Sequence, residues 1–234
     1  MHGLVVEREN KLVAVIIPAL NEEKSLPHVL EAIPAVGAVF VVDNGSTDAT
    51  AAVATRCGAT VLSEPIRGYG LACQKGIQAA NDGGFDVVVI LDGDHSFDPT
   101  QMSRLVGPIL QGKADMVLGD RTETAQPGAL TFPQRVGNRI ATRMIHAFSG
   151  HQYRDMGPFR AVTTKGLLSM QMEDPNYGWN VEMQLKALKN GLRVLEVPVD
   201  CRQRVAGQSK ISGSLRAAAR CGLKMVVATV RYGT

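Results

Sequence analysis

The sequence predicts an α/β protein in which a mostly parallel, twisted β-sheet carries helices on both faces. Short apolar runs rich in β-branched residues alternate with helical stretches over about the first 120 residues, which is the order of β-α-β units. Turn residues such as Pro18 and Gly58 separate these elements. The composition, 45% hydrophobic and 20% charged over 234 residues, is that of a globular protein with one large domain.

The first part of the chain contains the clearest elements. Strands are predicted at residues 12–17, 39–42, 59–62, 85–91 and 114–118. Helices are predicted between them at residues 25–35, 46–57, 71–80 and 99–110, with Ser25 and Ser46 as N-caps. The strand at 85–91 has a continuous apolar run, so we expect it in the centre of the sheet, buried on both faces.

The regular alternation of strands and helices ends after Asp120. A loop rich in Pro and Gly at residues 126–133 precedes a helix at 134–148, which carries Arg135, Arg139 and Arg143 four residues apart on one face. An extended segment follows at 155–162, then a helix at 178–189 and a strand at 192–199. A basic loop at 202–210 leads into a last helix at 214–231. Trp179, the only tryptophan, is predicted to anchor the core.

Composition excludes several classes of protein. The net charge of +3 is too small to indicate nucleic-acid binding. The four cysteines form no C-x-x-C pair, so neither a zinc site nor a disulfide framework is expected, and a reducing cytoplasm is the simplest location. We expect neither a signal peptide nor a membrane-spanning helix. The glycine-rich dinucleotide fingerprint and the P-loop are both missing after the first strand.

Polar clusters follow four of the predicted strands, at residues 18–23, 43–48, 92–94 and 119–121. In open α/β sheets, ligands bind beyond the carboxyl ends of the strands. Asp92 and Asp94 are two carboxylates one residue apart, which suits a hard divalent cation and, with it, a diphosphate. Arg121 would add a cation for the same diphosphate. Each cluster alone could be an ordinary turn, but four at one sheet edge indicate a site for a nucleoside diphosphate.

Four segments of the chain form a specific combination: VIIPALNEEKSL, VVDNGSTDAT, RGYGLACQKGIQAA and VVVILDGD. Together they resemble the family 2 glycosyltransferases with the GT-A fold, and the likeness extends over about residues 13–215. Within that family the chain is most similar to the polyprenyl-phosphate sugar transferases that make dolichyl-phosphate mannose and glucose. The resemblance implies that Asp94 binds Mg²⁺ or Mn²⁺, with Asp92 beside it on the nucleotide side. It also implies a donor pocket lined by Pro18, Ala19, Asn21, Glu22, Asp43 and Arg121.

The sequence departs from the family pattern at two places. The usual pair of aspartates after the second strand is Asp43-Asn44 here, so a change in the ribose or base contacts is expected. Relatives often carry a glutamine as a further metal ligand after the D-x-D, where this chain has His95 and Ser96. Both side chains can bind metals, but a histidine near a strand end is more often a hydrogen-bonded loop residue.

The second half resembles the acceptor side of the family. Asp155 lies in its acceptor-side segment, and Glu182 resembles the helix carboxylate that faces the sugar; the alternative for Glu182 is an exposed residue paired with Lys186. Arg204, Ser209 and Lys210 resemble the R-x-x-G-x-S-K loop that grips the acceptor phosphate. The last helix has a basic stripe of Arg216, Arg220 and Lys224, which is typical of a membrane-surface helix and also of a helix packed on its own domain.

The sequence therefore predicts a metal-dependent, inverting glycosyltransferase that uses a UDP- or GDP-linked sugar. We expect one domain over residues 1–234, with a donor half at about 12–121, an acceptor half at about 122–211 and an amphipathic helix at 212–234. A polyprenyl phosphate acceptor needs no general base, whereas a soluble hydroxyl acceptor needs one, for which Glu182 and Asp155 are candidates. A nucleotide-sugar-binding module without turnover is the non-enzymatic alternative. Peripheral contact with the cytoplasmic membrane face and homo-oligomers are compatible with the sequence.

Overall fold

The computed structural model describes residues 12–204 and 215–233, and in the last helix it describes the side chains from residue 224 onward. The strands are β1 (Val13–Ala19), β2 (Ala38–Asp43), β3 (Thr60–Ser63), β4 (Val87–Ile90), β5 (Met116–Asp120), β6 (Arg160–Thr163) and β7 (Val194–Pro198). The helices are α2 (Leu26–Ala32), α3 (Thr50–Arg56), α4 (Tyr69–Asp82), α5 (Met102–Leu110), α6 (Phe132–Ser149), α7 (Thr164–Met170), α8 (Trp179–Lys189) and α9 (Leu215–Gly233), with a short 3₁₀ turn at Pro99–Gln101.

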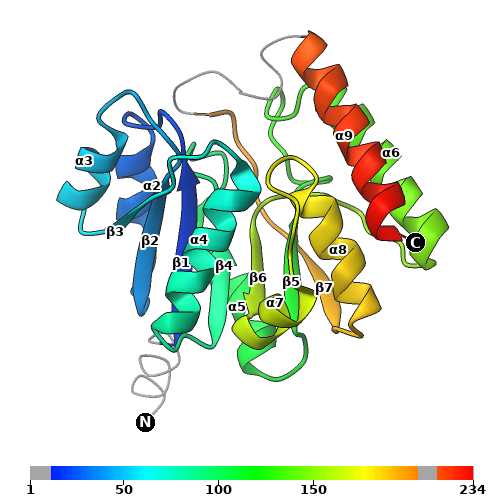
Figure 1. Cartoon of the computed structure of the whole chain (residues 1–234), viewed down its shortest axis with the longest axis horizontal. Helices are drawn as coiled ribbons and strands as arrows, with labels where there is room; N and C mark the ends of the chain where they lie inside the picture. Colours follow the sequence, from blue (N-terminus) through cyan, green and yellow to red (C-terminus); the bar gives the residue numbers. More distant parts are fainter. Residues whose placement is uncertain (1–11, 205–214, 234) are drawn as a thin grey trace.

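The described strands form one seven-stranded sheet in the order β3-β2-β1-β4-β6-β5-β7 (Figure 1). The pairs among β3, β2, β1 and β4 are parallel, as is the pair of β5 and β7. Strand β6 alone runs antiparallel to its neighbours β4 and β5. The predicted α/β fold with a mostly parallel sheet is confirmed.

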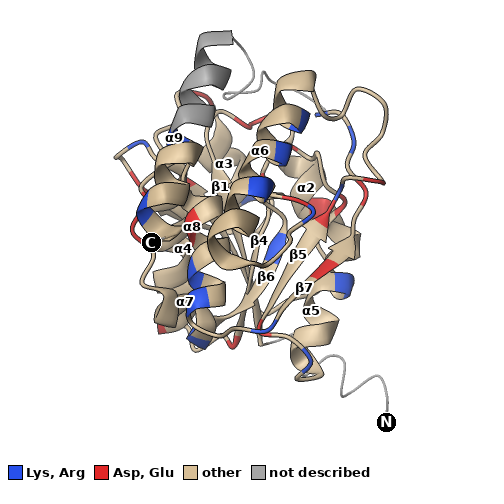
Figure 2. Ribbon diagram, turned by 90° about the vertical axis from the view of Figure 1, so that its right-hand side faces the viewer, with Lys and Arg blue, Asp and Glu red and all other residues tan. Residues whose placement is uncertain are grey.

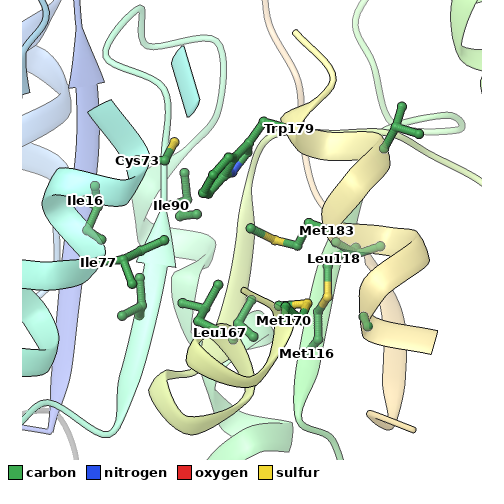
Figure 3. Packing of buried hydrophobic residues seen from close by; sticks show 14 of the residues in the cluster. Ile16, Cys73, Ile77, Ile90, Met116, Leu118, Leu167, Met170, Trp179 and Met183 are labelled. Carbon is green, nitrogen blue, oxygen red and sulfur yellow. The ribbon is translucent and has the colours of Figure 1, made fainter. Parts of the chain in front are cut away.

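The core lies on both faces of this sheet because alternate residues of its central strands point to opposite sides. In β1, Ala14 and Ile16 join the cluster beneath α4 and α8, while Val13, Val15 and Ile17 join the cluster beneath α2 and α5. Strand β4 is buried along its whole length, as its apolar run predicted. The first cluster includes Trp179, which is 1% exposed and packs close to Cys73 and Ile90 as the predicted core anchor (Figure 3).

The second half differs most from the expected elements. The segment expected to be extended at 155–162 contributes only a four-residue strand, β6, and the chain then enters α7, which the sequence pattern did not predict. The centre of the sheet is thus completed by a segment from the second half, because β6 inserts between β4 and β5. Arg160 in β6 is fully buried, and its guanidinium donates to the carbonyl of Gly157.

Helices α6 and α9 run side by side along one edge of the molecule (Figures 1 and 2). A side chain at Gly233 would collide with Phe148, which shows how closely the ends of the two helices approach. Helix α6 begins with a capping box in which Thr131 and Gln134 bond each other's backbone, and it ends at Gly150 with φ of 71°. No helix in the described ranges is long and apolar enough to cross a membrane.

Candidate active site

A cavity of about 560 Å³ opens where β1, β4 and β5 end. Its sheet-edge side is lined by the predicted residues Pro18, Ala19, Glu22, Asp92, Asp94 and Arg121, and Arg204 joins them. Its other side is formed by the first half of α6 and by the segment that leads into α8, which contribute Gln134, Asn138, Asn176, Tyr177 and Asn180. The four remaining predicted residues that the structure describes, Asn21, Asp43, Asp155 and Glu182, are not among the residues that line it.

Asp92 and Asp94 lie directly beyond β4. Asp94 is 3% exposed, accepts a hydrogen bond from the backbone N–H of Ser96 at 2.9 Å, and forms an ion pair with Arg204 at 2.8 Å. Burial and, next, the charge of Asp94 raise the pKa of Asp92 to about 7, while Arg204 and Arg121 lower it. The pair is therefore a concentration of negative charge that the protein offsets with nearby cations.

This pair has the chemistry of a divalent-cation site. Carboxylate oxygens are ligands that Mg²⁺ and Mn²⁺ accept, and Mg²⁺ commonly takes one or two protein carboxylates together with substrate phosphates. In the described part of the chain, no group of three or more Asp, Glu, His or Cys side chains could hold a metal ion. Two carboxylates at the cavity wall therefore fit a cation that shares its remaining positions with a bound diphosphate.

The polar clusters after β1 and β2 bind mainly to each other. Asn21, at φ of 53°, accepts a hydrogen bond from the N–H of Thr47 at 2.8 Å, and its own N–H donates to Ser46 at 3.0 Å. The prediction that Ser46 caps a helix is wrong, because α3 begins only at Thr50 and the Ser46 hydroxyl holds the β1 turn instead. Asp43 is half-buried and accepts from the N–H of Ser46 at 3.2 Å. These contacts fix the two turns beside the cavity.

Asn44 explains one departure from the family pattern. Its amide nitrogen donates to the carbonyls of Glu64 at 3.0 Å and Ile66 at 2.7 Å, and its amide oxygen accepts from the N–H of Gly68 at 2.7 Å. A carboxylate could not make the two donations. Asn44 thus ties the segment before α4 to the end of β2, and this segment includes Arg67 and Gly68 in the cavity wall.

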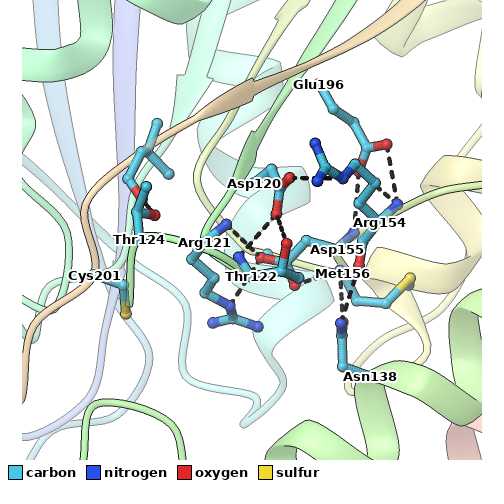
Figure 4. Close-up of polar contacts among 12 residues, drawn as sticks. Asp120, Arg121, Thr122, Thr124, Asn138, Arg154, Asp155, Met156, Glu196 and Cys201 are labelled. Atoms are coloured by element: carbon cyan, nitrogen blue, oxygen red, sulfur yellow. Dashed lines mark hydrogen bonds and ion pairs between the residues drawn. The ribbon is translucent and has the colours of Figure 1, made fainter. Parts of the chain in front are cut away.

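Arg121 is held in place by Asp155, a residue that sequence reasoning treated as a candidate base. Asp155 is 1% exposed, and its Oδ2 lies 3.0 Å from both the backbone N and Nε of Arg121 (Figure 4). Its Oδ1 accepts from the N–H of Met156 at 2.7 Å. Glu196 on β7 in turn accepts from the backbone N–H groups of Arg154 and Asp155. In this structure Asp155 orients a cavity-lining arginine.

Glu182 occupies a structural position rather than the cavity wall. It is fully buried in the first turn of α8, where its two oxygens accept from the N–H groups of Glu173 and Asp174, each at 2.7 Å. The pairing with Lys186, which belonged to the alternative interpretation, is present at 2.7 Å, but Glu182 is buried and not exposed as that alternative assumed. Both oxygens are engaged with the loop before α8, which leaves the predicted sugar-facing orientation without geometric support.

The basic segment after β7 reaches the donor side of the cavity. Arg204 is one-third exposed and lies 2.8 Å from Asp94 and 3.8 Å from Glu22. Arg202 donates to the carbonyl of His95 and approaches its Nε2 at 2.8 Å, so the histidine is a hydrogen-bonded loop residue, at φ of 59°. Ser209 and Lys210, the other two predicted phosphate-binding residues, lie outside the described residues.

Sequence reasoning missed two features of the cavity. Tyr69 at the start of α4 directs its hydroxyl toward Asp92 at 3.5 Å. The wall opposite the aspartates carries the amides of Gln134, Asn138, Asn176 and Asn180. The glycines around Tyr69 were a usable signal: a side chain at Gly70 would collide with Asp174 and Trp179, so the start of α4 must pack tightly at this wall.

Comparison with known proteins identifies the family to which the chain belongs. The family model described as "Glycosyl transferase family 2" matches residues 14–168. An uncharacterized glycosyltransferase of Mycobacterium tuberculosis is 40% identical over 206 residues, which cover 87% of this chain and 91% of the relative. The polyprenol monophosphomannose synthase of Mycolicibacterium smegmatis is 30% identical over 229 residues, covering 88% of this chain and 83% of the relative.

Solved structures share the fold. Glucosyl-3-phosphoglycerate synthase from Mycobacterium tuberculosis, in complex with Mn²⁺, UDP-glucose and phosphoglyceric acid, superposes with a TM-score of 0.78 at 23% sequence identity. The match covers 97% of this chain and 82% of that chain. At this level of identity the likeness establishes the fold, which is the GT-A fold that the sequence predicted. The bound ligands are a property of that protein alone.

Proposed function

Because the chain belongs to glycosyl transferase family 2, we propose that it transfers a sugar from a nucleoside-diphosphate sugar to the phosphate oxygen of a polyprenyl phosphate. The donor would occupy the sheet-edge side of the cavity, with Pro18, Ala19 and Glu22 near the nucleoside. The additional donor contacts of Asn21 and Asp43 remain predictions. The acceptor would enter from the side formed by α6 and the segment before α8.

The donor diphosphate has two kinds of partner in the cavity. Asp94, with Asp92 beside it, would hold Mg²⁺ or Mn²⁺, which would neutralise charge on the leaving diphosphate. Arg121 is fixed by Asp155 and lines the same cavity, so its guanidinium is available to a diphosphate oxygen. An arginine that is already oriented loses little side-chain entropy when it binds.

The observation that carries the choice of acceptor is the chemistry of the far wall. Among the described lining residues, the carboxylates are Glu22, Asp92 and Asp94, all on the sheet-edge side. The opposite wall offers amides and the hydroxyl of Tyr177, and it contains no carboxylate and no histidine among those residues. An alcohol acceptor requires a base to remove its proton, whereas an anionic phosphate oxygen does not. The wall therefore favours a phosphate acceptor.

The reaction then needs few groups from the protein. An oxygen of the acceptor phosphate forms a bond to the anomeric carbon as the bond from that carbon to the diphosphate oxygen breaks, and the electron pair leaves with the diphosphate. Attack from the opposite face inverts the anomeric centre. Arg202 and Arg204 line the cavity and would attract the anionic acceptor toward the donor. Leu130 and Met225 provide apolar surface at the same wall, which suits an isoprenoid chain.

Matched acceptors test this proposal. Labelled UDP-glucose and GDP-mannose would be offered with Mn²⁺ to detergent-dispersed polyprenyl phosphate, to the corresponding polyprenol without phosphate, and to a soluble alcohol. We expect transfer to the polyprenyl phosphate alone and loss of transfer in EDTA. Transfer to the polyprenol or the soluble alcohol with no reaction of the phosphate would overturn it.

A further inference from the structure

Helix α6 exposes an apolar ridge at its outer face. Phe132, Val136 and Ile140 are 78%, 39% and 48% exposed, and they follow one another at a spacing of four residues. At about 100° per residue this spacing forms a continuous ridge that drifts slowly around the helix. The side of α6 that faces the domain buries different residues, Ala141, Thr142 and Ile145. Three large apolar side chains in a row on an exposed helix face indicate a surface that binds an apolar partner.

A basic ridge runs beside the apolar one. Arg135, Arg139 and Arg143 are all exposed, and each lies three residues beyond its apolar neighbour. Helix α6 contains no Asp or Glu, so nothing on the helix neutralises these three charges. Figure 2 shows the basic positions of α6 following one another along the helix, on the side turned toward the viewer, with no acidic position on that helix. Parallel apolar and basic ridges are the pattern of a helix that lies in the interface of an anionic membrane.

The same helix forms part of the proposed acceptor entrance. Gln134, Gly137 and Asn138 come from the first half of α6 and line the cavity, while Phe132 and Val136 alternate with them along the helix. The apolar ridge and the cavity wall are thus adjacent faces of two helical turns. A membrane surface in contact with the ridge would therefore lie next to the cavity.

Helix α9, which the sequence suggested as a membrane-surface helix, fits this role less well. It packs against α6 and α8. Among its described cations, Lys224 lies over the ring of Tyr177 at 5.6 Å, and Arg231 pairs with Glu173 at 3.2 Å. These charges are engaged with the protein, and Arg216 and Arg220 lie outside the described side chains.

We propose that the outer face of α6, formed by Phe132, Val136, Ile140, Arg135, Arg139 and Arg143, seats the protein on an anionic lipid surface. The purpose of this docking rests on the proposed function, since it would present the cavity to an acceptor held in that surface. A second copy of the chain fits this face poorly, because a two-fold contact brings the same surface against itself and would set three arginines against three arginines.

Vesicle co-sedimentation without donor or acceptor tests the docking separately from catalysis. The whole chain would be mixed with vesicles of phosphatidylglycerol and phosphatidylcholine, and with vesicles of phosphatidylcholine alone. We expect binding to the anionic vesicles that falls as salt is raised. The triple variant R135Q/R139Q/R143Q should bind on the order of a hundredfold more weakly, given the usual contribution of a cation near such a surface. Phe132→Asp and Ile140→Asp should each weaken binding by roughly tenfold or more.

Matched controls carry the same changes on other faces. The triple variant R56Q/K75Q/K165Q removes three exposed cations, and Leu168→Asp places a charge on an apolar residue that is 45% exposed on α7. Both should bind the anionic vesicles as the unchanged protein does. In detergent, where no surface is needed, the α6 variants should transfer sugar to dispersed polyprenyl phosphate at an unchanged rate, so a failure of the transfer assay in every form would count against the proposed function and not against the docking.

Three results would overturn the docking proposal. They are absence of binding by the unchanged protein to anionic vesicles, equal loss of binding in the α6 variants and their controls, and a stable dimer in sedimentation velocity that Phe132→Asp dissociates. The last result would assign the face to a second copy of the chain.

Discussion

Two pairs of buried carboxylates differ in what their oxygens contact. Asp155 and Glu182 lie in the second half, and backbone N–H groups and cations engage the oxygens of each. Asp92 and Asp94 lie beside each other at the cavity, where the Asp92 carboxyl meets a tyrosine hydroxyl at only 3.5 Å and Asp94 pairs with a partly exposed arginine. All four acids are removed from solvent or nearly so, yet only Asp92 and Asp94 line the cavity, where a ligand can reach them.

This difference shows that burial alone does not identify a working carboxylate. A buried acid whose oxygens all accept hydrogen bonds from fixed backbone groups stabilises a loop, because the bonds favour its charged form and hold its geometry. A buried acid beside a like charge is destabilised until a cation arrives. Burial and the neighbouring charge of Asp94 raise the pKa of Asp92, as expected for an acid in such a position.

The largest effect is expected from the cavity pair. Asp94→Asn should reduce transfer by roughly a thousandfold or more, because a metal ion stabilises the leaving diphosphate by several kcal/mol. The melting temperature should change little, since the substitution removes one of two adjacent buried charges. Calorimetry with UDP or GDP should show that Mn²⁺ no longer tightens nucleotide binding. Activity that survives both the substitution and EDTA would rule out the metal assignment.

For Glu182, which lies outside the cavity, we expect a substitution to lower stability more than activity. Glu182→Gln replaces an oxygen that accepts a backbone N–H and weakens the pairing with Lys186, so stability should fall by about 3 kcal/mol. Thermal denaturation would show a loss of several degrees, while the rate of transfer to polyprenyl phosphate at low temperature stays within a few-fold. If the melting temperature is unchanged and transfer is abolished, Glu182 acts as a catalytic base after all.

A smaller effect is expected from Asp155, which acts through Arg121. Asp155→Asn and Arg121→Gln should each weaken diphosphate binding, and the double variant should be little worse than either alone, with a coupling of about 1–2 kcal/mol. A double-mutant cycle on the affinity for UDP or GDP measures this coupling. Additive losses would mean that the ion pair at 3.0 Å does not position the arginine for the ligand.

The smallest effect concerns a carboxylate far from the cavity. Asp115, just before β5, bonds Arg193, and this holds the pKa of Asp115 at about 2, below its ordinary value. A lowered pKa in the folded state means that the stabilisation is present above about pH 4 and is lost as the pH falls toward 2. The pair is partly exposed, so Asp115→Asn should cost less than about 1 kcal/mol at pH 7. Urea denaturation at several pH values should show this difference shrinking below pH 4.

The sequence predicted the donor edge well because its signals are local. The strands β1 to β5 follow from hydrophobic runs, and the polar residues that end them occupy the sheet edge by the geometry of parallel strands. The position of Asp92 and Asp94 could be predicted from strand β4 alone, because they directly follow it. The register of neighbouring strands then brought Arg121 to the same wall.

The second half was harder because its contacts join distant segments. Glu182 is bonded by a loop eight and nine residues earlier, and Asn44 by a segment that begins twenty residues later, so neither role is visible in a local pattern. Strand β6 begins within the segment that was predicted to be extended, but its place in the centre of the sheet is not visible locally, because Arg160 in it is a residue type that is seldom buried. In each of these three examples, the role of the residue or strand depends on contacts with segments that are distant in the sequence.

The position of β6 has a consequence for how the protein is made. While the ribosome is still synthesising residues before 160, β4 and β5 each present an open edge, because the strand that joins them has not yet emerged. The two core clusters at the sheet include residues as late as Cys201 and Tyr232, so they close long after the aspartates have been translated. A fragment that stops after Arg121 would leave those edges uncovered and should aggregate. The donor edge of the sheet therefore depends on a strand from the second half of the chain, and the two halves cannot be separated at residue 121 without opening the sheet.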